Sequence, residues 1–415
     1  MKVLFLSESG DGLSVGQRLV EEGHDVWFWI KDAKQYADSG RGIVERVDSW
    51  RPWVKEADLV VADMVGFGQY DYVVKEKGTP ALSLNKVSDL LELDRGKAIE
   101  LFEKANMTLP TTYKFGSPEE AKELAVTFPE RGVVIKPSGN IETAGTRIAR
   151  SAEQYEWALQ QYGQAQSFIV QEIVEGVEVS CEGWFNGKDW LEPFNITFEE
   201  KKLLPGGYGP NTGCMGNVVM PLTSNTRLAK ETVQKLTPWL SKIGYRGPID
   251  INSIVNEDGA HVLEATARMG YDAIEALMEG LKEPVIDLLF ETAVGVKKKM
   301  DLTQDKMIAV RLSVPPWPSA EPKQKHKGMP IGGLTPERLK HIYMTDVYKE
   351  DEEYKYAAGD GVVMKVTARG RDVREARNRV YRTVDGIELL DKQFRTDIGK
   401  RVNSDVEQLR SLGYL

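Results

Sequence analysis

Short apolar runs alternate with glycine-containing turns and helical stretches over the first 94 residues of the chain. A turn at Ser7–Ser14 follows the first apolar run, and the segment Val15–Glu22 then has a helical pattern. The expected strands are Met1–Ser7, Asp25–Ile30, Leu59–Asp63 and Ala81–Leu84. This order predicts a doubly wound parallel sheet, in which ligands bind at the carboxyl ends of the strands. The turn at Ser7–Ser14 would therefore face a site.

Two pairs of apolar runs in the middle of the chain predict antiparallel hairpins. Val133–Lys136 and Arg147–Arg150 flank a glycine-containing loop and would form a lid. Gly247–Val255 is followed by a turn at 256–259 and by a second apolar run that ends at Glu264. Because side chains alternate along a strand, Asp250 and Asn252 share one face of this second hairpin.

Longer periodic stretches predict helices, and the last of them is amphipathic. Residues 373–387 place Val373, Ala376, Val380 and Val384 on one side of a helix. In the stretch Asn225–Ile243, Pro238 should kink or break the helix. The other expected helices are Asp94–Ala105, Ala273–Gly280 and Pro284–Gly295, and the last unit should contain strands at Ile308–Val314 and Gly361–Ala368. We expect four units, at 1–94, 95–185, 186–300 and 301–415.

Glu264 and Arg268 stand at the end of a buried run and suggest a magnesium–phosphate site. Mg²⁺ prefers hard oxygen ligands that it shares with substrate phosphates, and arginine clamps phosphoryl oxygens. A strand edge with one solvated salt bridge is the simpler interpretation of this stretch alone. Asn252 and Asp272 are further candidates for the metal shell. Lys136, at the end of another apolar run, suits a phosphate better than it suits packing.

Composition excludes several classes of protein. The chain has 415 residues, a net charge of −9 and only two cysteines. The acidic balance argues against non-specific binding to nucleic acid or anionic membranes. A disulfide framework and a cysteine zinc site are excluded by the cysteine count. The chain enters a strand at its first residues, and no apolar run approaches a membrane span, so we expect a cytoplasmic protein with small-molecule partners, monomeric or weakly dimeric.

Three motifs carry a resemblance to a known family. Gly209–Gly216 (GPNTGCMG) is similar to GPNTGGMG, Leu263–Gly270 (LEATARMG) resembles LEFNxRFG, and Phe394–Arg401 (FRTDIGKR) resembles YRTDIGxR. These are motifs of the phosphoribosylamine–glycine ligase family in the ATP-grasp superfamily. The resemblance implies an α/β ATP-grasp fold with an N-terminal parallel-sheet domain, a two-lobed nucleotide clamp and a C-terminal α/β cap. It also implies joining of glycine to phosphoribosylamine with ATP, through an acyl phosphate.

The resemblance also implies roles for particular residues. Lys136 and Arg268 would be catalytic. The implied ATP-binding residues are Lys97, Lys136, Gly145, Arg147, Gln171, Glu172, Val174 and Glu178, with Arg147 replacing a lysine of the family's loop. The implied substrate-binding residues are Ser9, Gly10, Glu199, Lys201, Asn211, Thr212, Gly213, Met215, Gly216, Arg268 and Gly270. Glu264, Asn252 and Thr266 would hold Mg²⁺ or Mn²⁺, although Thr266 stands where the family has asparagine.

The first loop departs from the family. SESGDGLS replaces a GGGREH-like loop and introduces Glu8 and Asp11, which would oppose a phosphate. Three hypotheses therefore stay open at this point. The chain is the glycine ligase itself, a divergent ligase that joins a small amino acid to another amine, or a nucleotide-binding relative that has lost catalysis.

Overall fold

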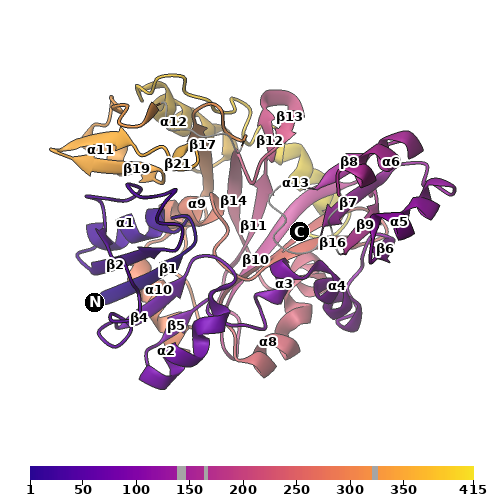
Figure 1. Cartoon of the computed structure of the whole chain (residues 1–415), viewed down its shortest axis with the longest axis horizontal. Helices are drawn as coiled ribbons and strands as arrows, with labels where there is room; N and C mark the ends of the chain where they lie inside the picture. Colours follow the sequence, from indigo (N-terminus) through magenta and orange to yellow (C-terminus); the bar gives the residue numbers. More distant parts are fainter. Residues whose placement is uncertain (138–145, 163–166, 320–325) are drawn as a thin grey trace.

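The chain folds around a long antiparallel sheet that lies between a parallel sheet and a smaller antiparallel sheet (Figure 1). The computed structural model describes residues 1–137, 146–162, 167–319 and 326–415. Gly145, which the sequence assigns to ATP binding, lies outside the described residues. Within these ranges, no helix combines the length and the apolar character that crossing a membrane requires.

The N-terminal sheet is parallel throughout, as the alternating pattern predicted, with strand order β3-β2-β1-β4-β5. Its strands are β1 Lys2–Ser7, β2 Asp25–Ile30, β3 Glu45–Arg46, β4 Leu59–Ala62 and β5 Ala81–Leu82, and its helices are α1 Leu13–Glu21, η1 Phe67–Tyr70 and α2 Asp71–Lys77. Gly12 donates its backbone N–H to Asp63 Oδ2 at 2.8 Å, and a Cβ at Gly12 would lie 2.8 Å from the Asp63 Cβ. Only glycine allows the first loop to approach the end of β4 so closely.

A small lobe follows, built on a sheet of strand order β6-β9-β7-β8. Its elements are β6 Thr112–Phe115, α5 Pro118–Ala121, η2 Lys122–Ala125, β7 Val133–Pro137, β8 Arg147–Ala149, α6 Ala152–Gln160 and β9 Phe168–Glu172. It has its own hydrophobic cluster, which includes Ile135, Tyr155 and Phe168. Strands β7 and β8 pair antiparallel, so the predicted hairpin is confirmed. Helices α3 Leu90–Leu93 and α4 Arg95–Lys104 connect the N-terminal sheet to this lobe.

The large sheet is antiparallel, with strand order β16-β15-β10-β11-β14-β17-β21-β18 over the described residues. Its strands are β10 Val177–Asn186, β11 Phe194–Glu199, β14 Gly216–Leu222, β15 Arg246–Val255, β16 Ala260–Thr266, β17 Lys306–Ser313, β18 Ile342–Met344 and β21 Val362–Gly370. The sequence suggests a boundary between units at residue 300. Strand β14 lies before this residue and pairs with β17, which lies after it, so one sheet contains strands from both sides of the boundary. The four predicted units therefore stay predictions.

Two short ribbons and a set of helices complete the fold. The ribbons are β12 Lys202–Leu204 with β13 Tyr208–Asn211, joined by η3 Pro205–Gly207, and β19 Val347–Glu350 with β20 Glu353–Tyr356. The helices are α9 Ala273–Gly280, α10 Val285–Val294, α11 Pro336–Leu339, α12 Val373–Asp385 and α13 Val402–Ser411. Helix α12 buries Val373, Ala376, Val380 and Val384, which are the four residues predicted from its period.

The helix predicted for Asn225–Ile243, with a kink or break at Pro238, is broken in the structure. The structure divides the segment into α7 Arg227–Glu231, η4 Val233–Leu236 and α8 Thr237–Ile243. The break lies at Thr232, which is fully buried and has φ −114° and ψ −107°. Pro238 lies in the first turn of α8, where a missing N–H leaves no helical hydrogen bond unmade, so proline here begins a helix and does not kink one.

Candidate active site

A cavity of about 980 Å³ lies between the small lobe and the large sheet. Strands β7 and β8 contribute to one side, and strands β10, β11 and β16 contribute to the other. The segments 200–213 and 395–401 also line it. Its charged lining residues are Lys136, Arg147, Glu178, Glu199, Glu200, Lys201, Lys202, Glu264, Arg268, Arg395, Asp397 and Arg401. The cavity therefore collects side chains from segments far apart in the sequence.

A register shift in the β15–β16 hairpin shapes the centre of the cavity. Asn252 pairs with Glu264, but Ser253 pairs with Val262, so Leu263 is an extra residue in β16. Bulges of this kind bend a strand and redirect its side chains, often next to active sites. The carbonyl oxygen of Leu263 accepts a hydrogen bond from Lys136 Nζ at 3.0 Å. The bulge thus ties the large sheet to β7 of the small lobe.

The carboxylate of Glu264 is surrounded by cations. Arg95 Nη1 lies 3.4 Å from its Oε2, and Lys201 Nζ lies 3.7 Å from its Oε1. Burial disfavours the charge, but Lys201, Lys136 and Arg95 together lower the pKa of Glu264 to about 2. Glu264 is therefore ionised at every pH at which the protein would work, as a metal ligand requires.

Lys136 is a buried lysine that lines the cavity. The residue is only 6% exposed, and burial lowers its pKa to about 8, with Arg95 and Lys201 adding repulsion. Glu264 acts in the opposite direction. A buried, weakly compensated ammonium group favours an incoming anion, because the anion supplies the missing counter-charge.

Lys201 is the cation at the centre of three carboxylates. Its Nζ lies 3.0 Å from Glu178, 3.6 Å from Glu199 and 3.7 Å from Glu264. Burial opposes its charge, but Glu264, Glu199 and Glu178 raise the pKa of Lys201 well above its usual range. This cluster keeps Lys201 protonated and fixes the positions of the carboxylates around it.

Asn252 and Glu264 fit a divalent metal of the magnesium type. They lie opposite each other on β15 and β16. Asn252 is 5% exposed, and its Nδ2 donates to Glu178 at 3.1 Å. Its Oδ1 is buried and has no hydrogen-bond partner among the described residues. An unsatisfied amide oxygen beside an ionised carboxylate is a donor set that Mg²⁺ prefers. Thr266 lies opposite Asp250, further along the same strand pair.

Arg268 lines the cavity and forms an ion pair with a carboxylate of the connecting helix α3. Its Nη2 lies 3.0 Å from Glu92 on α3, and its Nη1 donates to the Met269 carbonyl. Asp272, a further metal candidate, is fully buried in a two-oxygen ion pair with Arg311, at 2.8–3.2 Å. Arg311 already engages both oxygens of the carboxylate, and a metal-binding role for Asp272 stays a prediction.

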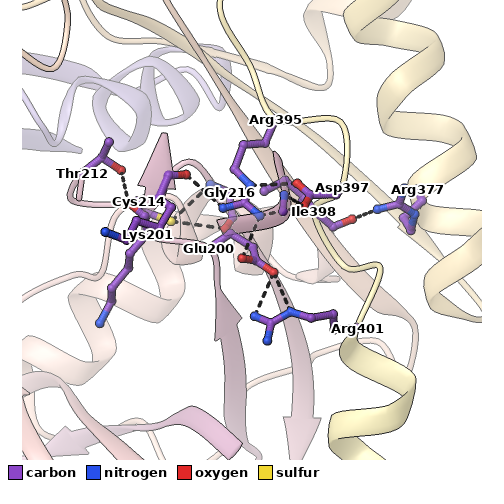
Figure 2. A network of polar contacts seen from close by, with 12 residues as sticks. Glu200, Lys201, Thr212, Cys214, Gly216, Arg377, Arg395, Asp397, Ile398 and Arg401 are labelled. Atoms are coloured by element: carbon purple, nitrogen blue, oxygen red, sulfur yellow. Dashed lines mark hydrogen bonds and ion pairs between the residues drawn. The ribbon is translucent and has the colours of Figure 1, made fainter. Parts of the chain in front are cut away.

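The segment that resembles YRTDIGxR lines one side of the cavity. Figure 2 shows the polar contacts between this segment and the loop around Glu200. Arg395 is buried and contacts Asp397 through two hydrogen bonds of 2.8 Å, and Glu200 at 3.0 Å. Arg401, which is exposed, reaches the other oxygen of Glu200 at 3.2 Å. On the opposite side of Glu200, Thr212 donates both its N–H and its hydroxyl to the Lys201 carbonyl. The motif therefore anchors the loop that carries Lys201.

Several residues assigned from the sequence lie away from the cavity. Lys97 is exposed, and its ammonium lies 3.0 Å from Asp94, the N-cap of its own helix. Glu172 and Val174 line a separate cavity of about 430 Å³, and Glu172 accepts a hydrogen bond from Tyr113. Gln171 is buried in β9 and donates to Thr112. Their roles in ATP binding stay predictions.

The glycine-rich loop divides between the cavity and the core. Asn211, Thr212 and Gly213 line the cavity. Met215 is fully buried and packs with Trp317 and Val362, while a Cβ at Gly216 would lie 2.5 Å from the Ala309 carbonyl oxygen. Gly270 lies near the Glu182 carboxylate, at 3.8 Å from the position of a Cβ. These contacts give Met215 and Gly216 a clear packing role.

The acidic first loop is partly neutralised by its neighbours. Lys31 Nζ lies 2.8 Å from Glu8, and Ser9 donates its hydroxyl to Asp11. Gly10 has φ +97° and donates its N–H to Ser7. Burial, reinforced by Asp11, raises the pKa of Asp63 to about 8, which favours the neutral acid beside the loop. The negative charge expected from the sequence is therefore smaller in the folded protein.

Sequence reasoning missed Arg95 and assigned no roles to Glu200, Arg395 and Arg401. Arg95 Nε also donates to the Pro137 carbonyl at 3.1 Å, which places this arginine between the two lobes. The sequence assigned ATP binding to Lys97 in the first turn of this helix. Arg95, two residues earlier, is the residue that contacts Glu264. The terminal motif was recognised as a pattern, but its residues became site candidates only through their contacts with Glu200.

Two family descriptions match most of this arrangement. Residues 97–273 match "Phosphoribosylglycinamide synthetase, ATP-grasp (A) domain", and residues 319–401 match "Phosphoribosylglycinamide synthetase, C domain". Together these matches cover the small lobe, Glu264, Arg268 and the terminal motif.

Individual proteins show the same similarity. The chain is 26% identical to the phosphoribosylamine–glycine ligase of Streptomyces coelicolor, over 79% of this chain and 80% of that one. The enzyme of that name from Clostridium acetobutylicum gives the same identity and the same coverage. A crystal structure of phosphoribosylamine–glycine ligase from Thermotoga maritima superposes with a TM-score of 0.74 at 21% identity, covering 96% of this chain and all of that one.

Proposed function

This chain belongs to the phosphoribosylglycinamide synthetase family, and from that premise we propose that it joins glycine to 5-phosphoribosylamine at the expense of ATP. The products would be glycinamide ribonucleotide, ADP and phosphate, as expected for an ATP-dependent C–N ligase. The observation that carries the proposal is the convergence of Lys136, Lys201 and Glu264 in one cavity between two lobes.

The chemistry needs an activated carboxylate, and charge neutralisation supplies most of the catalysis. The carboxylate of glycine takes the γ-phosphoryl group of ATP, which releases ADP, and the amine then displaces phosphate from the acyl phosphate. Positioning and electrostatic stabilisation dominate phosphoryl transfer, so a histidine or cysteine nucleophile is not required. Both cysteines are fully buried or nearly so, and burial raises the pKa of both thiols.

In the proposed reaction, the charged residues of the cavity have different roles. Lys136 binds ATP phosphate oxygens, and Arg268 binds the carboxylate or phosphoryl group being transferred. Glu178, Glu199 and Lys201 hold the surrounding charges in place. Glu264 and Asn252 hold the divalent metal, for which Mg²⁺ is the best fit to the oxygen donors. When bound, the metal would supply positive charge that offsets the negative charge of the phosphate groups.

The alternative of another amine acceptor loses part of its support in the folded protein. It depends on repulsion between a sugar phosphate and the first loop, but Lys31 pairs with Glu8. Asp11 remains the carboxylate that would oppose a phosphate there. We therefore place phosphoribosylamine first. The expected cytoplasmic location and the monomeric or weakly dimeric state stay predictions.

The test is product formation by the purified protein with ATP, Mg²⁺, glycine and freshly made phosphoribosylamine. We expect a mass-spectrometric signal for glycinamide ribonucleotide, together with one ADP for each product molecule. Growth of a purine-requiring strain that lacks the synthetase, without added purine, would support the same conclusion in cells. ADP release with other amines, without product from phosphoribosylamine, would instead establish the divergent ligase. A protein that binds ATP but releases no ADP with any amine would be a non-catalytic relative.

A further inference from the structure

A second charged cavity lies on a different part of the molecule, where α1, α9, β21 and α12 meet. Its volume is about 610 Å³, and it shares no lining residue with the catalytic cavity. Helix α1 contacts both α9 and β18, and α12 packs along β21, so the cavity joins the N-terminal and C-terminal parts of the chain. Figure 1 shows these elements together on the side away from the small lobe.

The lining of this cavity is strongly basic. Five of its side chains are permanently cationic, and one carboxylate, Glu279, accompanies them. The cationic residues are Arg18, Lys340, Arg369, Arg379 and Arg382. This concentration is unexpected in a chain whose net charge is −9. A concave group of like charges attracts a counter-ion much more strongly than scattered surface charges do.

Carboxylates neutralise only part of this charge, since Arg379 pairs with Glu375 at 2.6 Å and Arg18 lies 3.8 Å from Glu21. Glu279 is nearly buried, and it accepts hydrogen bonds from His341 Nδ1 at 3.0 Å and from the Thr367 hydroxyl at 2.8 Å. The hydrogen bond to Glu279 raises the pKa of His341, against repulsion from Arg18 and Lys340. Arg18 and Lys340 are therefore close enough to the His341 imidazole to repel its positive charge.

Donors in the cavity remain available for a ligand. Lys340 and Arg382 are exposed and have no ion pair among the described residues. Arg369 has only a distant contact of 4.0 Å with Asp305. The Nε of Arg18 is buried and makes no hydrogen bond in the described part of the chain, although it lies 3.8 Å from Glu21. Unsatisfied guanidinium donors suit phosphate oxygens, which they bind in pairs.

We propose that this basic cavity is a second binding site, which takes a small molecule carrying two or more phosphate charges. The volume lies in the range of small-molecule sites, and a concave group of cations suits a compact anion. An extended nucleic acid would need a longer basic stripe along the surface. The site is separate from ATP and glycine binding, so it is independent of the proposed ligase activity.

Inorganic pyrophosphate is the probe, titrated calorimetrically into the full-length protein at low salt without divalent metal. We expect two classes of site in the wild-type protein, one in each cavity. The double variant K340A/R382A removes two exposed cations that have no described ion pair, so the fold should be unchanged. In this variant the second class should weaken by at least about tenfold, because two charge-assisted contacts are lost.

The matched control is R374A/K298A, which removes the same charge from exposed positions outside both cavities. It should bind pyrophosphate like the wild type, and K136A should lose only the other class of site. Equal binding by K340A/R382A and the control would overturn the proposal. Binding of a single-stranded oligonucleotide that depends on Lys340 and Arg382, without any pyrophosphate binding there, would also overturn it and indicate a nucleic-acid surface.

Discussion

Glu264 illustrates how neighbouring side chains determine the role of one carboxyl group. Arg95, Lys136 and Lys201 lower its pKa to about 2, although partial burial acts against ionisation. A lone glutamate at a strand end would be ordinary, whereas one that stays ionised beside an unsatisfied amide oxygen is suited to hold a metal.

Substitution of Glu264 by alanine should abolish turnover and leave a folded protein. The loss of one metal ligand removes charge neutralisation at the transferring phosphoryl group, so we expect at least about a hundredfold lower rate of ADP release. Circular dichroism should show cooperative melting. Glu257→Ala, in the exposed turn of the same hairpin, is the control and should keep full activity. An active E264A protein would direct attention to Asn252 as the main ligand.

Lys136 should make ATP binding sensitive to alkaline pH. Its pKa is about 8 in the free protein, so its positive charge is lost as the pH rises above that value. The affinity for ATP should then fall by up to about tenfold for each pH unit, because binding requires one proton. Lys136→Arg keeps the charge and should show a flatter profile. Calorimetric titrations from pH about 7 to about 9.5 would test this, and identical profiles for both proteins would contradict it.

Glu182 should make the folded protein less stable as the pH rises. Burial raises its pKa from 4.5 to about 7, so between these values the folded protein binds more protons than the unfolded chain. The stability contributed by this group therefore falls as the pH rises from 4.5 to 7, and the full cost is present above pH 7.

Glu182→Gln should remove that cost, because glutamine still accepts the Trp184 indole hydrogen bond. The free energy of unfolding should increase by up to about 3 kcal/mol at pH about 8 and change little at pH about 4. Urea denaturation at the two pH values would measure the difference. An equal effect at both would show that packing, and not ionisation, is responsible.

At the scale of elements, the terminal motif holds the loop between β11 and β14 in place. Arg395 is buried between Asp397, Glu200 and the Lys202 carbonyl, which it reaches at 3.0 Å. Its neighbour Arg401 contacts the same glutamate from the solvent side. The two arginines thus make similar ion pairs in very different surroundings.

Arg395→Ala should destabilise the protein by about 1.5–3 kcal/mol, since it removes the charged hydrogen bonds of a buried guanidinium to two partly buried carboxylates. Hydrogen exchange should increase in residues 200–213, and ligase activity should fall because Lys201 lies in this segment. Arg401→Ala is the matched comparison, with an expected effect below about 1 kcal/mol, as is usual for exposed pairs. Similar losses in both variants would mean that burial of Arg395 is not what determines its contribution.

At the scale of the whole molecule, the catalytic cavity depends on how the small lobe meets the large sheet. Lys136 of the small lobe donates to the Leu263 carbonyl of the large sheet, and Arg95 of the connecting helix α4 contacts Glu264. A ligand that binds both lobes adds new links across this boundary.

ATP with Mg²⁺ should therefore stabilise the folded protein and protect the small lobe. At a free concentration of about one hundred times the Kd, the stabilisation should be about 2.7 kcal/mol. Thermal melting and limited proteolysis of residues 105–175 would measure both effects. ATP without metal, and the E264A variant with metal, should each give a smaller shift. Equal protection in all three cases would argue against a metal bound between ATP and Glu264.

The sequence by itself determined the local elements and the main chemistry of the candidate site. Alternating apolar runs predicted the parallel sheet and both hairpins, and the period of α12 predicted its buried side. Lys136, Glu178, Glu199, Lys201 and Glu264 were all chosen from strand ends or motifs, and the structure brings them to one cavity. These features depend on residues close together in the chain, where hydrophobic period and charge are directly visible.

Only the tertiary structure decided which charges neutralise one another. Arg95 reaches Glu264 across 169 residues, Arg268 pairs with Glu92 across 176, and Asp272 is held by Arg311. The bulge at Leu263 and the pairing of Lys31 with Glu8 were likewise decided only by the tertiary structure. Electrostatic interactions depend on distance and burial in space, and neither can be obtained from spacing along the chain.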